Sequence, residues 1–353
     1  MEISELLELT VENKASDLHL VVGVPPALRI DGVLSPIPNE AVLTPERVNA
    51  LLQDVMTAEQ LERLNVNKEV DFSLSFSERA RFRVNAYTQK RTPAAAFRTI
   101  PLTIPTVDEL GLPPIMHSFT TLQQGFILVT GPTGHGKSTS LAAMLEEINT
   151  NRKTHIVTIE DPIEFVFSAK QSIISQREMN MDTHSWSIAL RSALREDPDV
   201  VLVGEMRDYE TIAAALTVAE TGHLVFATLH TNSAAQTVDR VVDVFPEEQQ
   251  DQVKLQLSNV LQAVISQRLV PAIAGGRVVA HEIMLASTAI RTAIREGKTH
   301  QIDSIIQTSS EVGMNTLEAS LADLVLTGKI TMETATTYAI RSDQLTRLVH
   351  RQA

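Results

Sequence analysis

The chain of 353 residues carries 30 basic and 43 acidic side chains, a formal charge of −13, and no cysteine. Its 43% hydrophobic and 21% charged residues are globular proportions, and the length predicts about two domains. The lack of cysteine excludes disulfides, cysteine nucleophiles and every thiolate-bound zinc or iron–sulfur centre. An acidic chain has no electrostatic reason to bind nucleic acid, so we expect no such partner.

No run approaches the ~18 apolar residues that a membrane-spanning helix needs. The acidic start, residues 1–5, does not resemble a signal peptide. We therefore expect a cytoplasmic protein that is not an integral membrane protein.

The first hundred residues predict a small α+β unit. Helical spacing covers residues 3–13, with Ser4 as a possible cap, and Thr44-Pro45 opens a second helix. Alternating patterns predict strands, and Asp31-Gly32 predicts a turn. The expected strands cover residues 17–22, 27–30, 70–75, 81–89 and 94–99.

A proline-rich segment, residues 100–114, predicts an ordered linker between a domain of residues 1–99 and a core of residues 115–285. In the core, short apolar runs alternate with helical segments, which is typical of a doubly wound α/β fold with a parallel sheet buried on both faces. The runs are residues 126–129, 156–159, 200–203 and 224–227. Residues 286–353 are expected to be helical.

One segment of the core fits the pattern G-x-x-x-x-G-K-[ST] of a phosphate-binding loop. Its residues are Gly131, Pro132, Thr133, Gly134, His135, Gly136, Lys137 and Ser138. It follows an expected strand and opens an expected helix, so backbone N–H groups and the helix N-terminus can bind nucleotide phosphates. Lys137 is expected to reach the β- and γ-phosphates, and the Ser138 hydroxyl to bind Mg²⁺. A chance glycine-rich turn is the alternative.

Acidic residues follow two other expected strands. Glu205 follows the run 200–203, where such folds present a carboxylate on the metal side, although Gly204 replaces the usual Asp. Glu160 and Glu164 follow the run 156–159, and a carboxylate there can orient the attacking water. Ordinary strand-end or solvated carboxylates are the alternatives.

Two histidines bracket the run 224–227. His223 and His230 are both expected beside the strand end next to the phosphate-binding loop, in reach of a γ-phosphate. A structural role is the alternative for each of them.

Four segments in chain order resemble the Walker A, Asp box, Walker B and His box of the secretion ATPase superfamily. They are residues 131–138, 158–165, 193–207 and 220–231. Residues 15–19 and 289–296 are similar to the type IV pilus retraction ATPases of that superfamily. The resemblance implies an N-terminal PAS-like domain, a RecA-like P-loop NTPase core and a homohexameric ring. It also implies Mg²⁺-dependent ATP hydrolysis that powers pilus disassembly and twitching motility.

The resemblance also implies residue roles. Glu164 corresponds to the general base, Glu205 to the Walker B acid, and Arg83 and Arg98 to N-domain arginines that neutralise phosphates. The implied catalytic residues are Glu164, Glu205, Arg83, Arg98 and His230. The implied nucleotide-binding residues are those of the loop with Thr139, Glu160 and His223, and the implied metal ligands are Ser138 and Glu205.

The implied partners are five further copies of the chain and the cytoplasmic face of the pilus platform protein in the inner membrane. An accessory role beside a retraction ATPase, as in a PilU-like paralogue, stays open, as does another ATPase of the superfamily. Pilus extension ATPases usually carry a tetracysteine zinc site, which this chain lacks. A DNA translocase would need a basic channel, and a scaffold without turnover would not need Lys137, Ser138, Glu164 and Glu205.

Three positions depart from the family pattern. His135 stands where Ser is usual, Phe167 where the Asp box continues with His, and Thr292-Ala293 interrupts the usual AIRNLIRE. In this last segment Ile290 and Ile294 share one helix face, and Arg291 and Arg295 a neighbouring one. Local sequence predicts a packing helix with a solvated basic edge, started by Ser287 or Thr288. The resemblance makes the same segment the motif that couples hydrolysis to retraction.

Overall fold

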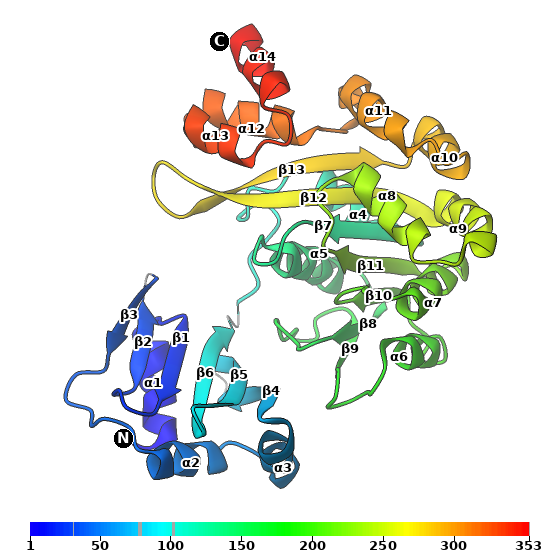
Figure 1. Ribbon diagram of the computed structural model, residues 1–353. Coiled ribbons are helices and arrows are strands. Elements are labelled where there is room, and N and C mark those ends of the chain that lie inside the picture. Colours follow the sequence, from blue (N-terminus) through cyan, green and yellow to red (C-terminus); the bar gives the residue numbers. More distant parts are fainter. Residues whose placement is uncertain (31, 77–79, 101–102, 353) are drawn as a thin grey trace. The chain divides into compact units, whose positions relative to one another are not determined.

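The structure, a computed structural model, describes residues 1–30, 32–76, 80–100 and 103–352 (Figure 1). The chain divides into two compact units, one of Met1–Thr103 with Pro162–Val166 and one of Ile104–Asp161 with Phe167–Ala353. The turn expected at Asp31-Gly32 begins outside the described residues.

The first unit contains a six-stranded antiparallel sheet in the order β3-β2-β1-β6-β5-β4. Its strands are β1 (Asp17–Val21), β2 (Ala27–Ile30), β3 (Val33–Pro36), β4 (Glu69–Phe76), β5 (Ala80–Gln89) and β6 (Thr92–Ile100). Its helices are α1 (Ile3–Glu12), α2 (Pro45–Gln53) and α3 (Ala58–Asn67). Alternate strand residues such as Leu18, Phe82 and Phe97 share one buried cluster with the apolar residues of these helices.

The sequence predicted the first residues of α1 and α2. The N-cap predicted for α2 is correct, and the one predicted for α1 is wrong. The Thr44 hydroxyl accepts a hydrogen bond from the Arg47 N–H, which confirms the start of α2. Ser4 is not the cap of α1, because the helix already begins at Ile3 and the Glu5 carboxylate accepts a hydrogen bond from the Glu2 N–H. The N-cap is Glu2, so the prediction of Ser4 is wrong by two residues.

The second unit contains a seven-stranded sheet in the order β13-β12-β7-β11-β10-β8-β9. Its strands are β7 (Gly125–Thr130), β8 (His155–Glu160), β9 (Ile173–Glu178), β10 (Val200–Val203), β11 (Leu224–Leu229), β12 (Leu261–Pro271) and β13 (Arg277–Leu285). All neighbours are parallel except β12 and β13, which form an antiparallel hairpin. The parallel core is confirmed, and the hairpin makes the sheet mixed.

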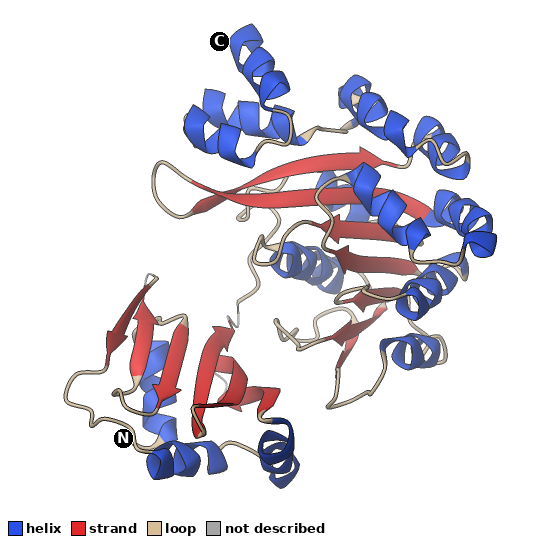
Figure 2. Ribbon diagram, viewed as in Figure 1, coloured by secondary structure: helices blue, strands red, loops and turns tan. Residues whose placement is uncertain are grey.

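Helices cover both faces of this sheet (Figures 1 and 2). They are α4 (Ile115–Thr120), α5 (Lys137–Asn151), α6 (Trp186–Ala193), α7 (Tyr209–Glu220), α8 (Ala234–Asp243) and α9 (Glu247–Val260). Successive residues of β7 point to opposite faces: Ile127 and Val129 pack with α4 and α5, while Phe126 and Leu128 pack with the other helices. Every residue of β7 is buried, which explains its continuous apolar sequence.

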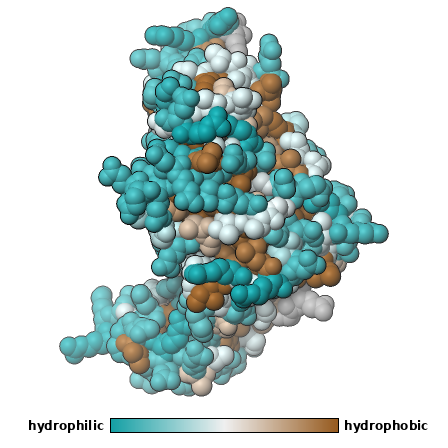
Figure 3. Space-filling view, turned by 90° about the vertical axis from the view of Figure 1, so that its right-hand side faces the viewer, coloured by the Kyte–Doolittle hydropathy of each residue, from teal (hydrophilic) through white to brown (hydrophobic). Residues whose placement is uncertain are grey.

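The helical C-terminal region is confirmed. It comprises α10 (Thr288–Arg295), α11 (Ile302–Thr308), α12 (Leu317–Leu326), α13 (Met332–Tyr338) and α14 (Ser342–Gln352), with short 3-10 turns at Thr299–Gln301 and Ser310–Val312. The last three helices pack on the hairpin around Val270 and Ala280. Among the described residues no helix combines the length and apolar character needed to cross a membrane. Hydrophilic residues dominate the face drawn in Figure 3, with apolar residues in separate small patches.

Candidate nucleotide-binding site

The phosphate-binding loop lies between β7, in the middle of the sheet, and α5. Gly136 is the residue before the helix and has φ +82°, and Gly134 has φ +79°. Both lie in the left-handed region, where glycine carries no Cβ penalty. A Cβ on Gly131 would lie 2.3 Å from the backbone oxygen of Gln267, so only glycine fits there. The glycine pattern is thus required by the backbone of the loop itself.

Lys137 turns its ammonium group back over the loop. Its Nζ donates hydrogen bonds to the backbone oxygens of Gly131 at 2.8 Å and of Pro132 at 3.0 Å. The side chain is buried although it is charged. A buried ammonium group beside the N-terminus of a helix is suited to an anion such as a phosphate.

Residues of β12 form hydrogen bonds with the phosphate-binding loop and with the end of β7. The sequence did not predict this role. The Ser266 hydroxyl bonds the Thr130 hydroxyl at 2.8 Å, and the amide Nε2 of Gln267 donates to the backbone oxygen of His135 at 2.7 Å. Gln267 is 1% exposed. No local motif marks these residues, because they lie about 130 positions beyond the loop in the chain.

The parallel strands bring three predicted residues to the carboxyl edge of the sheet that carries the loop. Glu160 ends β8, Glu205 follows β10, and His230 follows β11. His230 Nε2 lies 3.4 Å from a Glu205 carboxylate oxygen, and His230 Nδ1 lies 3.5 Å from the Thr133 hydroxyl of the loop. Glu205, His230 and the loop are therefore linked in one chain of contacts.

Arg207, which the sequence reasoning did not select, also binds this cluster. Its Nε lies 2.8 Å from the second carboxylate oxygen of Glu205. The Arg207 side chain is 73% exposed, whereas Glu205 is 17% exposed. Both oxygens of Glu205 thus have a partner before any metal is considered.

Packing accounts for Gly204, which replaces the usual Asp. A Cβ at this position would lie 3.2 Å from the Cα of Glu160 and 3.2 Å from the backbone oxygen of Ile159. The end of β10 is therefore too close to β8 to accept a larger residue without movement. Glu160 itself is buried and accepts hydrogen bonds from Thr158 at 2.6 Å and Gln176 at 3.2 Å.

His223 does not lie beside the loop, contrary to the sequence prediction. It precedes β11, and its backbone oxygen accepts a hydrogen bond from the N–H of Gly125, the first residue of β7. Because β7 and β11 are parallel, this is the amino edge of the sheet, opposite to the loop. The His223 ring bonds the backbone oxygen of Val218 at 3.0 Å, which is a structural role at the end of α7.

Three further predicted residues belong to the first unit. Glu164 is half-buried in the segment Pro162–Val166. Arg83 of β5 and Arg98 of β6 are direct cross-strand partners, and Arg98 Nε donates to the Asp17 carboxylate at 3.0 Å. The two arginines are therefore brought together on one sheet face, as adjacent phosphate-binding residues would have to be.

The donor chemistry fits a Mg²⁺ ion that arrives with a nucleotide. In the described part of the chain no group of three His, Asp or Glu side chains could hold a metal on its own. Magnesium commonly takes one or two protein oxygens together with phosphate oxygens and water. Ser138, at the start of α5, and the Glu205 carboxylate can supply those protein oxygens.

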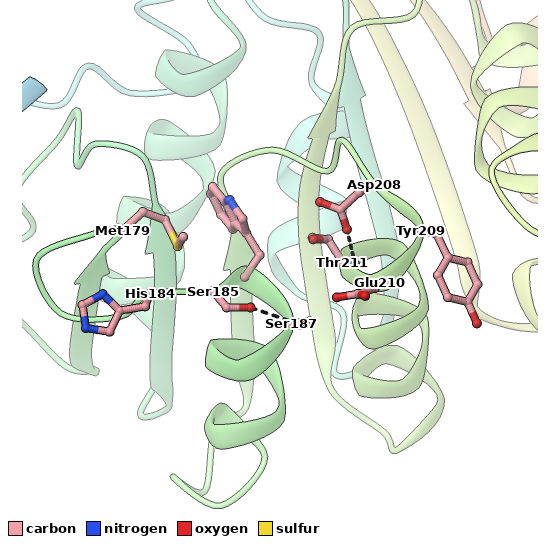
Figure 4. Close-up of a pocket in the computed structure, with 9 residues that line it drawn as sticks. Met179, His184, Ser185, Ser187, Asp208, Tyr209, Glu210 and Thr211 are labelled. Carbon is pink, nitrogen blue, oxygen red and sulfur yellow. Dashed lines mark hydrogen bonds between the residues drawn. The ribbon is translucent and has the colours of Figure 1, made fainter. Parts of the chain in front are cut away.

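A pocket of about 470 Å³ lies at the same edge, between the first turns of α6 and α7 (Figure 4). Ser185 and Asp208 cap the two helices by accepting hydrogen bonds from the N–H groups of Ile188 and Thr211. None of the predicted site residues lines this pocket. At the start of each of the two helices, a backbone N–H group already donates to a side chain of the same chain.

A mostly parallel sheet with a phosphate-binding loop, a buried lysine and carboxylates at one edge is the arrangement of a P-loop NTPase. Residues 2–337 match the family described as Type II/IV secretion system protein. The chain therefore belongs to that family.

Two proteins and one solved structure are similar to nearly the whole chain. The type IV pilus retraction ATPase PilT of Pseudomonas aeruginosa is 53% identical over 95% of this chain and 97% of its own length. A twitching motility protein of Neisseria gonorrhoeae is 51% identical over 91% of this chain and 86% of its own length. The crystal structure of the pilus retraction motor PilT with bound ADP superposes with a TM-score of 0.92 at 48% identity, covering 98% of this chain and 99% of that one.

Proposed function

We propose that this chain is an ATPase motor that works as a homohexamer and powers the retraction of type IV pili. The observation that carries the proposal is the loop itself, in which Lys137 turns inward and Thr133 is linked through His230 to Glu205. Similarity to retraction ATPases over nearly the whole chain supports the cellular output. Within the proposal, residues 1–99 are the PAS-like domain, 100–114 the linker, 115–285 the ATPase core and 286–353 the C-terminal region.

Each residue has a task in this proposal. Backbone N–H groups of the loop and the first turn of α5 bind the phosphates, and Lys137 neutralises their charge. Ser138 and Glu205 would hold Mg²⁺, which would supply positive charge to offset the negative charge of the phosphates. Glu164 takes the proton from the attacking water, and Arg83 and Arg98 stabilise the charge that develops on the transferred phosphoryl group.

His230 and Glu205 have a positioning part as well. A γ-phosphate near Thr133 would change the hydroxyl's contact with His230, and His230 transmits that change to the Glu205 carboxylate. Glu160, buried against Thr158 and Gln176, keeps the end of β8 rigid at the same edge. His223 has no part in this site, because it lies at the opposite edge of the sheet.

The biochemical test is ATP turnover by three forms of the purified chain. Lys137→Ala should lose ATP binding, and Glu164→Gln should bind ATP but lose hydrolysis, because one side chain contacts phosphate and the other acts on water. A Glu164→Gln protein with near-normal turnover would remove that residue as the base and leave Glu205 as the stronger candidate.

The proposed site of action is the cytoplasmic face of the inner membrane at the pilus base, against the platform protein. A PilU-like accessory role is the second candidate. The two differ when the chain is the sole retraction ATPase in a cell: a motor retracts pili alone, whereas an accessory protein needs its paralogue.

A further inference from the structure

His135 occupies an inner position of the phosphate-binding loop, but its ring is bonded to β12. The ring atom Nδ1 lies 3.0 Å from the backbone nitrogen of Leu269, which donates its N–H. The backbone oxygen of the same residue accepts the hydrogen bond from Gln267 Nε2 at 2.7 Å. One residue of the loop is thus tied to the strand through both its backbone and its side chain.

The length of β12 explains how this contact arises. β12 pairs with β7 in parallel, and their register ends where Ser266 lies opposite Thr130. β12 continues to Pro271, so Gln267 and Leu269 run alongside the loop after β7 has ended. A Cβ on Gly136 would lie 3.1 Å from Gln267 Nε2 and 3.4 Å from Leu269 Cδ1, which shows how closely the strand and the loop pack.

The hydrogen bond specifies the chemical state of the imidazole. A backbone N–H can only donate, so Nδ1 must be the unprotonated acceptor and the ring proton must lie on Nε2. Only the neutral ring can do this. A protonated ring would present an N–H to the N–H of Leu269 and lose the bond.

We infer that His135 is a positioning residue, which holds the phosphate-binding loop in its nucleotide-binding shape by accepting a hydrogen bond from Leu269 of β12. The inference rests on the proposed nucleotide site and adds to it a side chain that need not touch the nucleotide. Without this bond, the hydrogen bond from Gln267 to the backbone oxygen of His135 is the one that still joins His135 to β12 among the residues that the structure describes. Nucleotide then has to organise a looser loop when it binds, and affinity falls.

The surroundings favour the neutral ring. Partial burial and then the positive charges of Arg268 on β12, Lys137 on α5 and Arg277 on β13 lower the pKa of His135 below its usual value of 6.5. A histidine with a lowered pKa is neutral at pH 7 and is protonated only on acidification. The bond is therefore intact at neutral pH and is lost as the pH falls through that lowered pKa.

Two variants separate the acceptor from the shape of the side chain. Asn places its amide oxygen near the position of Nδ1 and can accept the same hydrogen bond, whereas Leu has a similar size and cannot accept one. The test is calorimetric titration of the full-length protein with MgADP at pH 7.5. His135→Leu should bind MgADP about tenfold more weakly than the unmodified chain, and His135→Asn should recover most of that loss.

The pH profile is the second readout, and a role in fold stability alone would not produce it. As the pH is lowered from 7.5 through the lowered pKa of His135, the affinity of the unmodified chain should fall relative to that of His135→Asn, because only the histidine loses its acceptor. Protonation of ADP affects binding to both proteins equally, so it cancels in the ratio of their two affinities for MgADP. The exposed His300, changed to Asn, is the matched control and should leave the pH profile as it is in the unmodified chain.

The outcomes distinguish the inference from the function on which it rests. If the unmodified chain fails to bind MgADP, the proposed function is wrong. If it binds, Lys137→Ala does not, and His135→Leu binds as tightly as the unmodified chain, then the site stands and the positioning role of His135 is overturned. The positioning role is also overturned if His135→Asn binds MgADP as weakly as His135→Leu. It is likewise overturned if the affinity of His135→Asn changes with pH in the same way as that of the unmodified chain.

Discussion

Two glycines of the phosphate-binding loop have positive φ but different surroundings. Gly131 has φ +135° and no room for a Cβ, whereas Gly134 has φ +79° and nothing within 4 Å of a Cβ. Gly134→Ala therefore adds only backbone strain, about 1 kcal/mol. Gly131→Ala adds a clash with the Gln267 backbone and should cost roughly 3 kcal/mol or more.

The measurement is urea denaturation of both variants without nucleotide, followed by MgADP titration of each. Gly131→Ala should show the larger loss of stability and bind no MgADP, while Gly134→Ala retains most of its stability. Equal losses in the two variants would mean that the backbone of β12 can move away from the loop.

The sequence predicted the residues of the phosphate-binding loop, but it did not predict the residues of β12 that hydrogen-bond to the loop. The spacing of Gly131, Gly136 and Lys137 is diagnostic, because backbone cradling of phosphate needs those residue types in that order. Gln267 and Leu269 carry no such pattern. Their role follows from a strand that comes alongside the loop only in three dimensions.

The helix α10 shows that two arginines of one motif have different tasks. Arg291 donates to the backbone oxygens of Ser258 and Asn259, the latter at 2.8 Å, and so caps the C-terminal end of α9. Arg295 is exposed, and its Nη2 lies 3.3 Å from the Thr292 hydroxyl of its own helix. The expectation of a solvated basic edge is therefore wrong for Arg291. The start of the helix, capped by Ser287, is confirmed.

Arg291→Ala should lower the free energy of unfolding by about 1–2 kcal/mol, because it leaves helix-end carbonyls without a charged donor. Arg295→Ala should change it by less than about 0.5 kcal/mol. Thermal unfolding of the two single variants measures the difference. A coupling role in retraction is then tested cleanly with Arg295→Ala alone, and equal stability losses would contradict the capping role of Arg291.

A second element-scale feature links β13 to the start of α8. The buried Glu282 carboxylate accepts a hydrogen bond from the N–H of Ala234, the first residue of α8, at 2.7 Å. Burial, and then the nearby carboxylates of Asp303 and Glu318, raise the pKa of Glu282 to about 7, against the opposing effect of the Ala234 N–H and Arg341. The folded chain therefore holds this proton at pH values where the unfolded chain has released it.

Stability should consequently fall as the pH rises from about 4.5 to about 7, over which Glu282 binds more protons folded than unfolded. Glu282→Gln keeps an acceptor for Ala234 and has no charge to bury. Relative to the unmodified chain, it should gain up to roughly 3 kcal/mol between pH 4.5 and pH 8. Denaturant unfolding at the two pH values measures this, and a stability difference that does not change with pH would contradict it.

At the scale of the whole molecule, the strands that could be predicted from the sequence are those buried on both faces of the sheet. The four apolar runs became β7, β8, β10 and β11 because strands covered on both faces have no polar positions. The hairpin of β12 and β13 escaped prediction, since α9 passes into β12 with no glycine or proline between them. The position of His223 was wrong for another reason: residues that bracket a strand lie at opposite edges of a sheet.

The first unit carries a test of the proposed arginines. Arg98 and Arg29 both lie beside Asp17, on β6 and β2, at 3.0 and 3.8 Å from its carboxylate. Arg98 is 70% exposed, so Arg98→Ala should cost little stability but should lose most ATPase activity if the side chain acts on the phosphates. Arg29→Ala is the matched control and should retain turnover. Turnover that survives in Arg98→Ala would assign the arginine a role in the sheet only.

The most direct test of the central claim is microscopy of pili in host cells from which the gene for this chain has been deleted. If the chain powers retraction, these cells should carry many pili that do not retract. The unmodified chain should restore retraction and Lys137→Ala should not, because the output depends on ATP bound at the loop. Bald cells would indicate pilus extension instead, and cells that still retract normally would contradict the account.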